Sequence, residues 1–123
     1  MIQANELRIT NIVHFVKENV DAEIGHHNLG ILLAYPSTND YEPIPLTEEW
    51  LLKFGFEKQS DYFFYNNNYR VESFRSSEWC FRARVTKNES YPIAIIEYVH
   101  QLQNLYFALT GKELKLKNDD TSN

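Results

Sequence analysis

The chain has 123 residues, of which 43% are hydrophobic and 15% aromatic, and its formal net charge at pH 7 is −5. This apolar content excludes a fully disordered protein, and the acidic balance argues against a duplex-DNA-binding protein with a basic face. The one cysteine, Cys80, excludes an internal disulfide, and no apolar run approaches the roughly 20 residues of a membrane span. We expect a cytoplasmic protein with a single α+β domain over residues 1–115 and a disordered polar tail over residues 116–123.

Two strands are predicted in the N-terminal part of the chain. Residues 6–16 alternate between apolar and polar side chains, which is typical of a half-buried strand. The polar segment that follows ends in a turn signal at residues 25–28. Residues 29–35 are almost continuously apolar, which indicates a strand buried on both faces.

A short helix is predicted after the extended segment that contains Pro43 and Pro45. Thr47 can cap its N-terminus, and two glutamates follow where the helix dipole favours negative charge. Gly55 can end the helix in a left-handed conformation, with Phe56 folding back on Leu51.

Residues 61–86 predict a three-stranded antiparallel meander. Two aromatic strands flank the turn at residues 66–68, where asparagine tolerates the positive φ of a hairpin loop. In the third strand Trp79 and Phe81 face one way, while Arg82 and Arg84 face the other.

A longer helix is predicted to begin near Pro92 and to pack on the sheet. Its apolar residues recur at spacings of three and four and comprise Ile95, Val99, Leu102, Tyr106 and Leu109. Gly111 marks its end. Residues 92–96 can instead complete a strand, in which case the helix begins later.

Catalytic and metal-binding interpretations are weaker than structural ones for every reactive side chain. His26 and His27 are neighbours in a turn, and no second thiol accompanies Cys80, so the sequence lacks the ligand pattern of a zinc site. No phosphate loop, nucleophile elbow or metalloprotease motif is present. We therefore expect no enzyme activity, no metal and no small-molecule cofactor.

The arginines and aromatic residues of the meander are the most informative functional feature. Four of the five arginines lie between residues 70 and 84. They can contact RNA phosphates while exposed rings stack on bases, or they can bind an acidic protein partner. Alternatively, the rings pack under the last helix, and the arginines lie on the outer face in contact with solvent and bind no partner. The candidate binding residues are Arg70, Arg75, Arg82, Arg84, Lys87, Tyr65 and Tyr69.

Two longer motifs resemble a known protein family. They are PIPLTEEWLLKFGF at residues 43–56 and YVHQLQNLYFALTG at residues 98–111. Both resemble a family of small proteins from bacterial prophages and mobile elements, to which no reaction is assigned. Members typically open on an L-R-I-G-N core, and residues 7–11 match it except that Thr10 replaces the glycine.

The resemblance implies a phage-derived inhibitor of host defence. We expect such a protein to bind a host CRISPR effector nuclease, with an anti-CRISPR protein against a type VI-B RNA-guided RNA-cutting effector as the first hypothesis. Contact with the guide RNA is compatible with that role. The alternative is a small accessory protein that binds single-stranded RNA.

Overall fold

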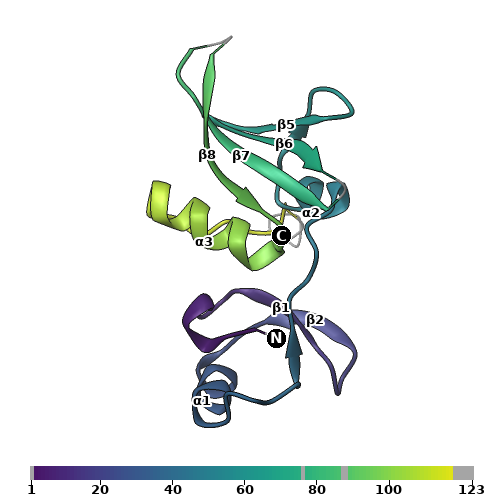
Figure 1. Ribbon diagram of the computed structural model, residues 1–123, viewed down its shortest axis with the longest axis vertical. Coiled ribbons are helices and arrows are strands. Elements are labelled where there is room, and N and C mark those ends of the chain that lie inside the picture. The colour runs from purple at the N-terminus through teal and green to yellow at the C-terminus, as the bar shows by residue number, and fades with distance from the viewer. Residues whose placement is uncertain (1, 76, 87–88, 118–123) are drawn as a thin grey trace. The chain divides into compact units, whose positions relative to one another are not determined.

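The computed structural model describes residues 2–75, 77–86 and 89–117, and it has an α+β fold with two antiparallel sheets (Figure 1). The chain divides into two compact units. The first consists of residues 1–45 and 98–113, and the second consists of residues 46–97 and 114–123. The expectation of one domain over residues 1–115 stays a prediction, and most of the predicted tail lies outside the described residues.

The first unit is built on a three-stranded antiparallel sheet in the order β2-β1-β3. These strands are β1 (Ile12–Phe15), β2 (Val20–Glu23) and β3 (Tyr41–Glu42). Apolar side chains from the sheet, the N-terminal segment and a helix form one buried cluster of Ile2, Leu7, Val13, Ile24, Leu32 and Tyr41. Packing of these side chains buries one face of the small sheet.

The predicted strand over residues 6–16 is largely wrong, because only Ile12–Phe15 are extended and paired. A 3-10 turn, η1 (Ala4–Glu6), precedes them. Thr10 then adopts a φ of 80°, in the left-handed region that side chains with a Cβ rarely occupy. This left-handed residue interrupts the alternating pattern just before β1 begins.

The predicted strand over residues 29–35 is also wrong, because these residues belong mainly to helix α1 (His26–Ala34). The Gly25 backbone N–H donates to the side-chain oxygen of Asn28 at 3.0 Å, which caps the first turn. Leu32 is buried, whereas Leu33 is 65% exposed. A short apolar run without clear periodicity fits a helix as well as a strand, and packing of Leu32 decides between them.

Helix α3 (Val99–Thr110) begins later than Pro92, as the alternative interpretation of residues 92–96 allowed. It lies beside β1 in the first unit, where the Ile12 backbone N–H donates to the Gln103 side chain at 2.8 Å. Val99 and Leu102 are buried on this helix. Gly111 ends it with a φ of 73°, so the predicted glycine C-cap is confirmed.

The second unit contains the predicted short helix, α2 (Glu48–Lys53). The Thr47 side chain accepts a hydrogen bond from the backbone N–H of Trp50, as the capping pattern predicted. Gly55 has a φ of 88°, and the Phe56 N–H donates to the Leu51 carbonyl at 3.0 Å. The predicted Schellman ending is therefore confirmed.

A five-stranded antiparallel sheet completes the second unit in the order β4-β5-β6-β7-β8 (Figure 1). Its strands are β4 (Glu57–Lys58), β5 (Phe63–Asn66), β6 (Tyr69–Arg75), β7 (Glu78–Arg84) and β8 (Ser90–Ile96). The predicted meander forms its centre, and Asn67 supplies the positive φ of the β5–β6 hairpin. The sequence interpretation missed β4, while β8 contains residues 92–96, which its alternative assigned to a strand.

One face of this sheet carries the core of the second unit. Phe64, Val71 and Phe81 are fully buried and lie on neighbouring positions of three strands. The Trp79 indole N–H donates to the Leu46 carbonyl at 2.9 Å, which ties β7 to the segment before α2. Within the residues that the structure describes, no helix combines the length and apolarity needed to cross a membrane.

Candidate interaction surface

The opposite face of the five-stranded sheet brings most of the predicted binding residues together. Strand register places Tyr65 opposite Arg70 and Arg70 opposite Arg82. Phe63, Glu72 and Arg84 lie two positions from these residues on the same strands, and side chains two apart share a face. We call this surface the arginine face, and it consists of Phe63, Tyr65, Arg70, Glu72, Arg82 and Arg84.

Aromatic rings hold the guanidinium groups of the arginine face. The Arg70 guanidinium carbon lies 4.5 Å from the ring centroid of Phe63 and 6.0 Å from that of Tyr65. The Arg84 guanidinium carbon lies 4.8 Å from the Tyr65 centroid. Because cation–π contact favours these positions, the two arginines are ordered without a bound partner.

Arg70 is also held by hydrogen bonds. Its Nη2 lies 2.9 Å from a carboxylate oxygen of Glu72, and its Nη1 donates to the Tyr65 hydroxyl at 3.3 Å. Burial by itself lowers the pKa of Arg70, but these two neighbours outweigh it, so the pKa is raised above its ordinary value. The guanidinium is therefore a fixed positive charge.

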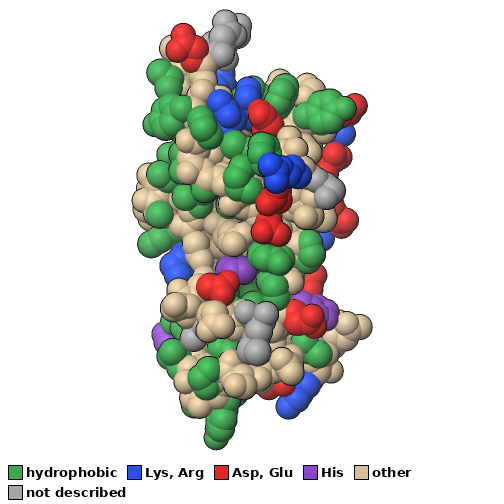
Figure 2. Space-filling model, viewed as in Figure 1, with side chains coloured by type: hydrophobic (Ala, Val, Ile, Leu, Met, Phe, Trp, Pro, Cys, Tyr) green, Lys and Arg blue, Asp and Glu red, His purple; other side chains and the backbone are tan. Residues whose placement is uncertain are grey.

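Arg82 and Arg84 have fewer partners. The Nε and Nη2 of Arg82 donate to the hydroxyl and the carbonyl of Ser90. Across the described ranges, no carboxylate lies within ion-pair distance of Arg82 or Arg84. Figure 2 shows Lys and Arg side chains interspersed with hydrophobic ones over the second unit.

The other candidate residues do not belong to the arginine face. Tyr69 lies on the buried face, with its ring centroid 5.4 Å from that of Phe81. Arg75 follows an irregularity in the β6–β7 register, lies 3.9 Å from Glu78 and covers the Phe74 ring. Lys87 lies outside the described residues.

Sequence reasoning missed Phe63, Glu72 and Ser90. Phe63 and Tyr65 are two positions apart in one strand, so alternation alone could have placed Phe63 beside Tyr65. Glu72 is likewise two positions from Arg70 in β6, so alternation could have placed it on the same face. Ser90 could not be found in this way, because its contact with Arg82 depends on the pairing of β7 with β8.

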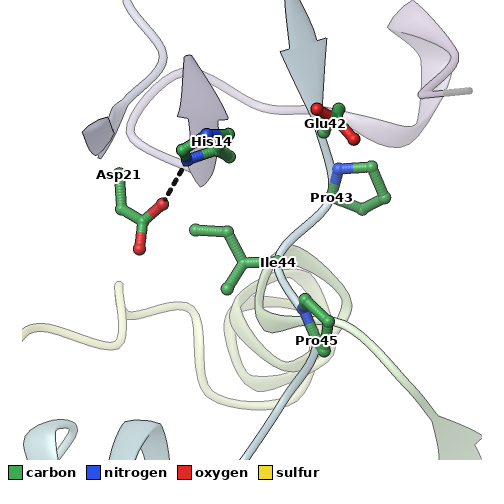
Figure 3. A pocket seen from close by; sticks show the side chains of 6 residues that line it. All are labelled: His14, Asp21, Glu42, Pro43, Ile44 and Pro45. Atoms are coloured by element: carbon green, nitrogen blue, oxygen red, sulfur yellow. Dashed lines mark hydrogen bonds and ion pairs between the residues drawn. The ribbon is translucent and has the colours of Figure 1, made fainter. Parts of the chain in front are cut away.

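A separate pocket of about 250 Å³ lies in the first unit (Figure 3). Strand register places His14 opposite both Asp21 and Glu42, and His14 Nδ1 lies 2.8 Å from an Asp21 carboxylate oxygen. Ile44 points toward this pair, and Pro43 and Pro45 complete the lining. The contact with Asp21 orients the His14 imidazole, and no Ser, Cys or Lys is among these lining residues.

No metal-binding cluster was found in the part of the chain that the structure describes. Among the described residues, no three His, Cys, Asp or Glu side chains come together in a way that could hold a metal ion. His26 and His27 begin α1 and are exposed. Cys80 is buried as a free thiol.

His100 is the most strongly buried histidine, at 1% exposure. Its Nε2 lies 3.3 Å from a Glu6 carboxylate oxygen, and its ring stacks on Tyr98. Burial lowers the pKa of His100, and the Glu6 carboxylate offsets only part of this effect. Its second ring nitrogen, Nδ1, is buried without a hydrogen-bond partner within the described chain.

Glu48 and Glu49 have structural partners. Glu48 lies 3.2 Å from Lys58, and Glu49 lies 3.4 Å from Lys53 one helical turn away. These contacts are typical of the first turn of a solvated helix rather than of an acid–base pair.

Comparisons with known proteins give no relative from which a role could be transferred. No family model, no curated protein and no solved structure matches the chain. The functional argument therefore depends on the arginine face itself.

Proposed function

We propose that this protein acts by binding a protein partner and performs no bond-making of its own. The alternation of guanidinium groups and rings on the arginine face is the observation that supports this most. Arginine and aromatic side chains are the residues that protein interfaces favour. Stacking on Phe63 and Tyr65 restrains two arginines in advance, which reduces the entropy lost when a partner binds.

The partner in this proposal is a host defence nuclease in the bacterial cytoplasm, and binding inhibits it. The support for this step is the resemblance of residues 43–56 and 98–111 to small prophage proteins, together with the small size of the chain. We take a type VI-B RNA-guided RNA-cutting effector, before or after guide-RNA loading, as the target. A stoichiometric inhibitor needs only a complementary surface, and the arginine face is the surface that we assign to this role.

The test uses the purified full chain and a purified type VI-B effector with its guide RNA. Co-elution in size-exclusion chromatography measures the complex, and cleavage of a reporter RNA measures inhibition. We expect one complex and a loss of cleavage near equimolar protein. Replacing Arg84 with alanine should weaken binding about tenfold, which corresponds to about 1.4 kcal/mol, because arginine is among the residues that contribute most at interfaces.

Arg75→Ala is the matched control, since Arg75 lies on the same sheet but outside the arginine face. It should leave the complex within about twofold of the unchanged protein. Absence of both co-elution and inhibition, with the effector active and the chain folded, would refute the proposed target.

A second candidate function is binding of single-stranded RNA. Exposed rings in the second unit favour it, since Tyr62 is 63% and Tyr91 53% exposed. Such rings can stack on unpaired bases. This candidate predicts that a labelled single-stranded oligonucleotide binds at low salt, and that affinity falls steeply as salt rises.

A further inference from the structure

We propose that Arg70, Arg82 and Arg84 form a carboxylate-binding site that takes an acidic, extended segment of the protein partner. This inference rests on the proposed function and names the chemistry that the arginine face recognises. Four features of the face support it: a like-charge pair, unused donors, the spacing of two arginines along β7, and rings that are already covered.

The like-charge pair consists of Arg70 and Arg82. They are direct cross-strand partners on β6 and β7. Like charges at directly opposed positions destabilise a sheet, and here one carboxylate, Glu72, neutralises only one of the two. An anion bound between them removes this repulsion, so binding of a carboxylate should stabilise the fold.

Unused donors remain on all three guanidinium groups, although the free Nε of Arg70 is buried. Arg82 donates through Nε and Nη2 to Ser90, while no bond is found from its Nη1 to any described residue. Arg84 is stacked on Tyr65 without an acceptor for its guanidinium in the described chain. A guanidinium with free N–H groups in a fixed plane matches a carboxylate through two parallel hydrogen bonds.

The spacing of the arginines favours an extended ligand. Arg82 and Arg84 are two positions apart on one strand, so their backbones lie about 6.7 Å apart. Carboxylates at alternate positions of an extended peptide have the same spacing. An acidic segment running parallel to β7 could therefore meet both arginines in register.

The positions of the rings on the arginine face favour a protein segment over a nucleic acid as the ligand. A guanidinium lies over each of Phe63 and Tyr65, which leaves less ring surface for bases to stack on. The chain as a whole carries a charge of −5, which repels a phosphate backbone at long range. The same charge opposes an acidic peptide less, because such a peptide carries one charge at every second residue rather than one at every nucleotide, and salt screens the repulsion beyond about 8 Å.

The experiment uses the full chain and a synthetic ten-residue peptide with Glu at every second position. Fluorescence anisotropy of the labelled peptide measures the Kd, and thermal melting of the chain measures stabilisation. We expect saturable binding and a melting temperature that rises with peptide concentration. The same peptide with Gln in place of Glu should bind at least tenfold more weakly.

Two variants locate the site. Arg82→Gln should weaken binding of the Glu peptide about tenfold, because the charged donor that pairs with a carboxylate is gone. Arg75→Gln is the matched control and should bind the peptide normally. Arg84→Gln provides a second reduction in affinity, so the test does not depend on the folding of one variant.

The outcomes separate this inference from the proposed function. If the Glu peptide does not bind at millimolar concentration while the nuclease complex still forms, the carboxylate site is refuted and the proposed function remains. If a single-stranded RNA displaces the peptide at lower concentration and shows the same sensitivity to Arg82→Gln, the acidic-protein ligand is refuted in favour of nucleic acid. If Arg75→Gln loses binding as much as Arg82→Gln, the site is misplaced and the inference fails.

Discussion

Arg8 and Glu113 form a bidentate ion pair, although 105 residues separate them in the sequence. Arg8 Nη1 lies 2.6 Å and Nη2 3.2 Å from the two carboxylate oxygens of Glu113. The same guanidinium donates through Nε to the Asn104 side chain at 2.8 Å and stacks on Phe107. The N-terminal segment and the end of α3 are therefore joined by one planar group within the first unit.

This geometry predicts that lysine cannot replace Arg8. A lysine ammonium cannot make two parallel hydrogen bonds to a carboxylate while also bonding Asn104. We expect Arg8→Lys to lower the free energy of unfolding by about 1–2 kcal/mol, measured by urea denaturation. Arg75→Lys is the control, because Arg75 is 73% exposed and lies 3.9 Å from Glu78; its effect should stay below about 0.5 kcal/mol. Equal effects of the two substitutions would contradict this assignment.

Thr10 predicts a stabilising substitution. Its φ of 80° is strained for a side chain with a Cβ, and its hydroxyl is buried without a hydrogen-bond partner in the described structure. Thr10→Gly removes both costs but adds backbone freedom to the unfolded chain, so we expect a net gain of about 1 kcal/mol. Thermal melting measures the change.

Asn19→Gly is the control for Thr10→Gly. Asn19 has a φ of 54°, which asparagine tolerates well. Its replacement should change the free energy of unfolding by less than about 0.5 kcal/mol. A lower melting temperature for Thr10→Gly would show that the threonine makes a contact worth more than the strain.

His100 predicts a pH dependence of stability. Burial holds its pKa below the ordinary value of 6.5, so near pH 6 the unfolded chain binds more protons than the folded chain. Above about pH 7 His100 is neutral in both the folded and the unfolded chain, so it does not lower the free energy of unfolding. As the pH falls through 6.5 toward the lower pKa of the folded chain, the free energy of unfolding decreases by no more than about 1.4 kcal/mol per pH unit. Urea denaturation between pH 7.5 and 5.5 should show this decline.

Matched histidine variants isolate the effect of His100. His100→Gln should flatten the decline between pH 7.5 and 5.5, because glutamine does not titrate. His27→Gln should leave the decline in place, since His27 is exposed at the start of α1. If both variants keep the same pH profile, another group controls acid stability.

We expect the hydrogen bond from Trp79 to contribute measurably to the free energy of unfolding. Its indole N–H donates to the Leu46 carbonyl, while its ring packs edge-on to Phe64 at 5.9 Å between centroids. Trp79→Phe keeps an aromatic ring but leaves the carbonyl without this donor, so we expect a loss of about 1–3 kcal/mol in unfolding free energy. Phe74→Leu, at a side chain that is 51% exposed, should cost much less. A similar loss in both would mean that the hydrogen bond contributes little.

The sequence by itself determined the elements that depend on neighbouring residues. Thr47 caps α2, Gly55 and Gly111 end helices, and Asn67 turns the β5–β6 hairpin, each at the position that the sequence predicted. Alternation in β7 placed Arg82 and Arg84 on one face. These features follow from backbone conformation and side-chain parity within a few residues, so no distant contact is needed to predict them.

Only the tertiary structure decided which distant residues meet. Residues 29–34 became part of a helix because Leu32 packs into the first unit's core, although the run is apolar enough for a strand. Arg70 lies opposite Arg82, and Arg75 is displaced from that face, because of the β6–β7 register and its irregularity near Phe74. Register and burial depend on the summed packing of side chains that are far apart in the sequence, and no local pattern contains that information.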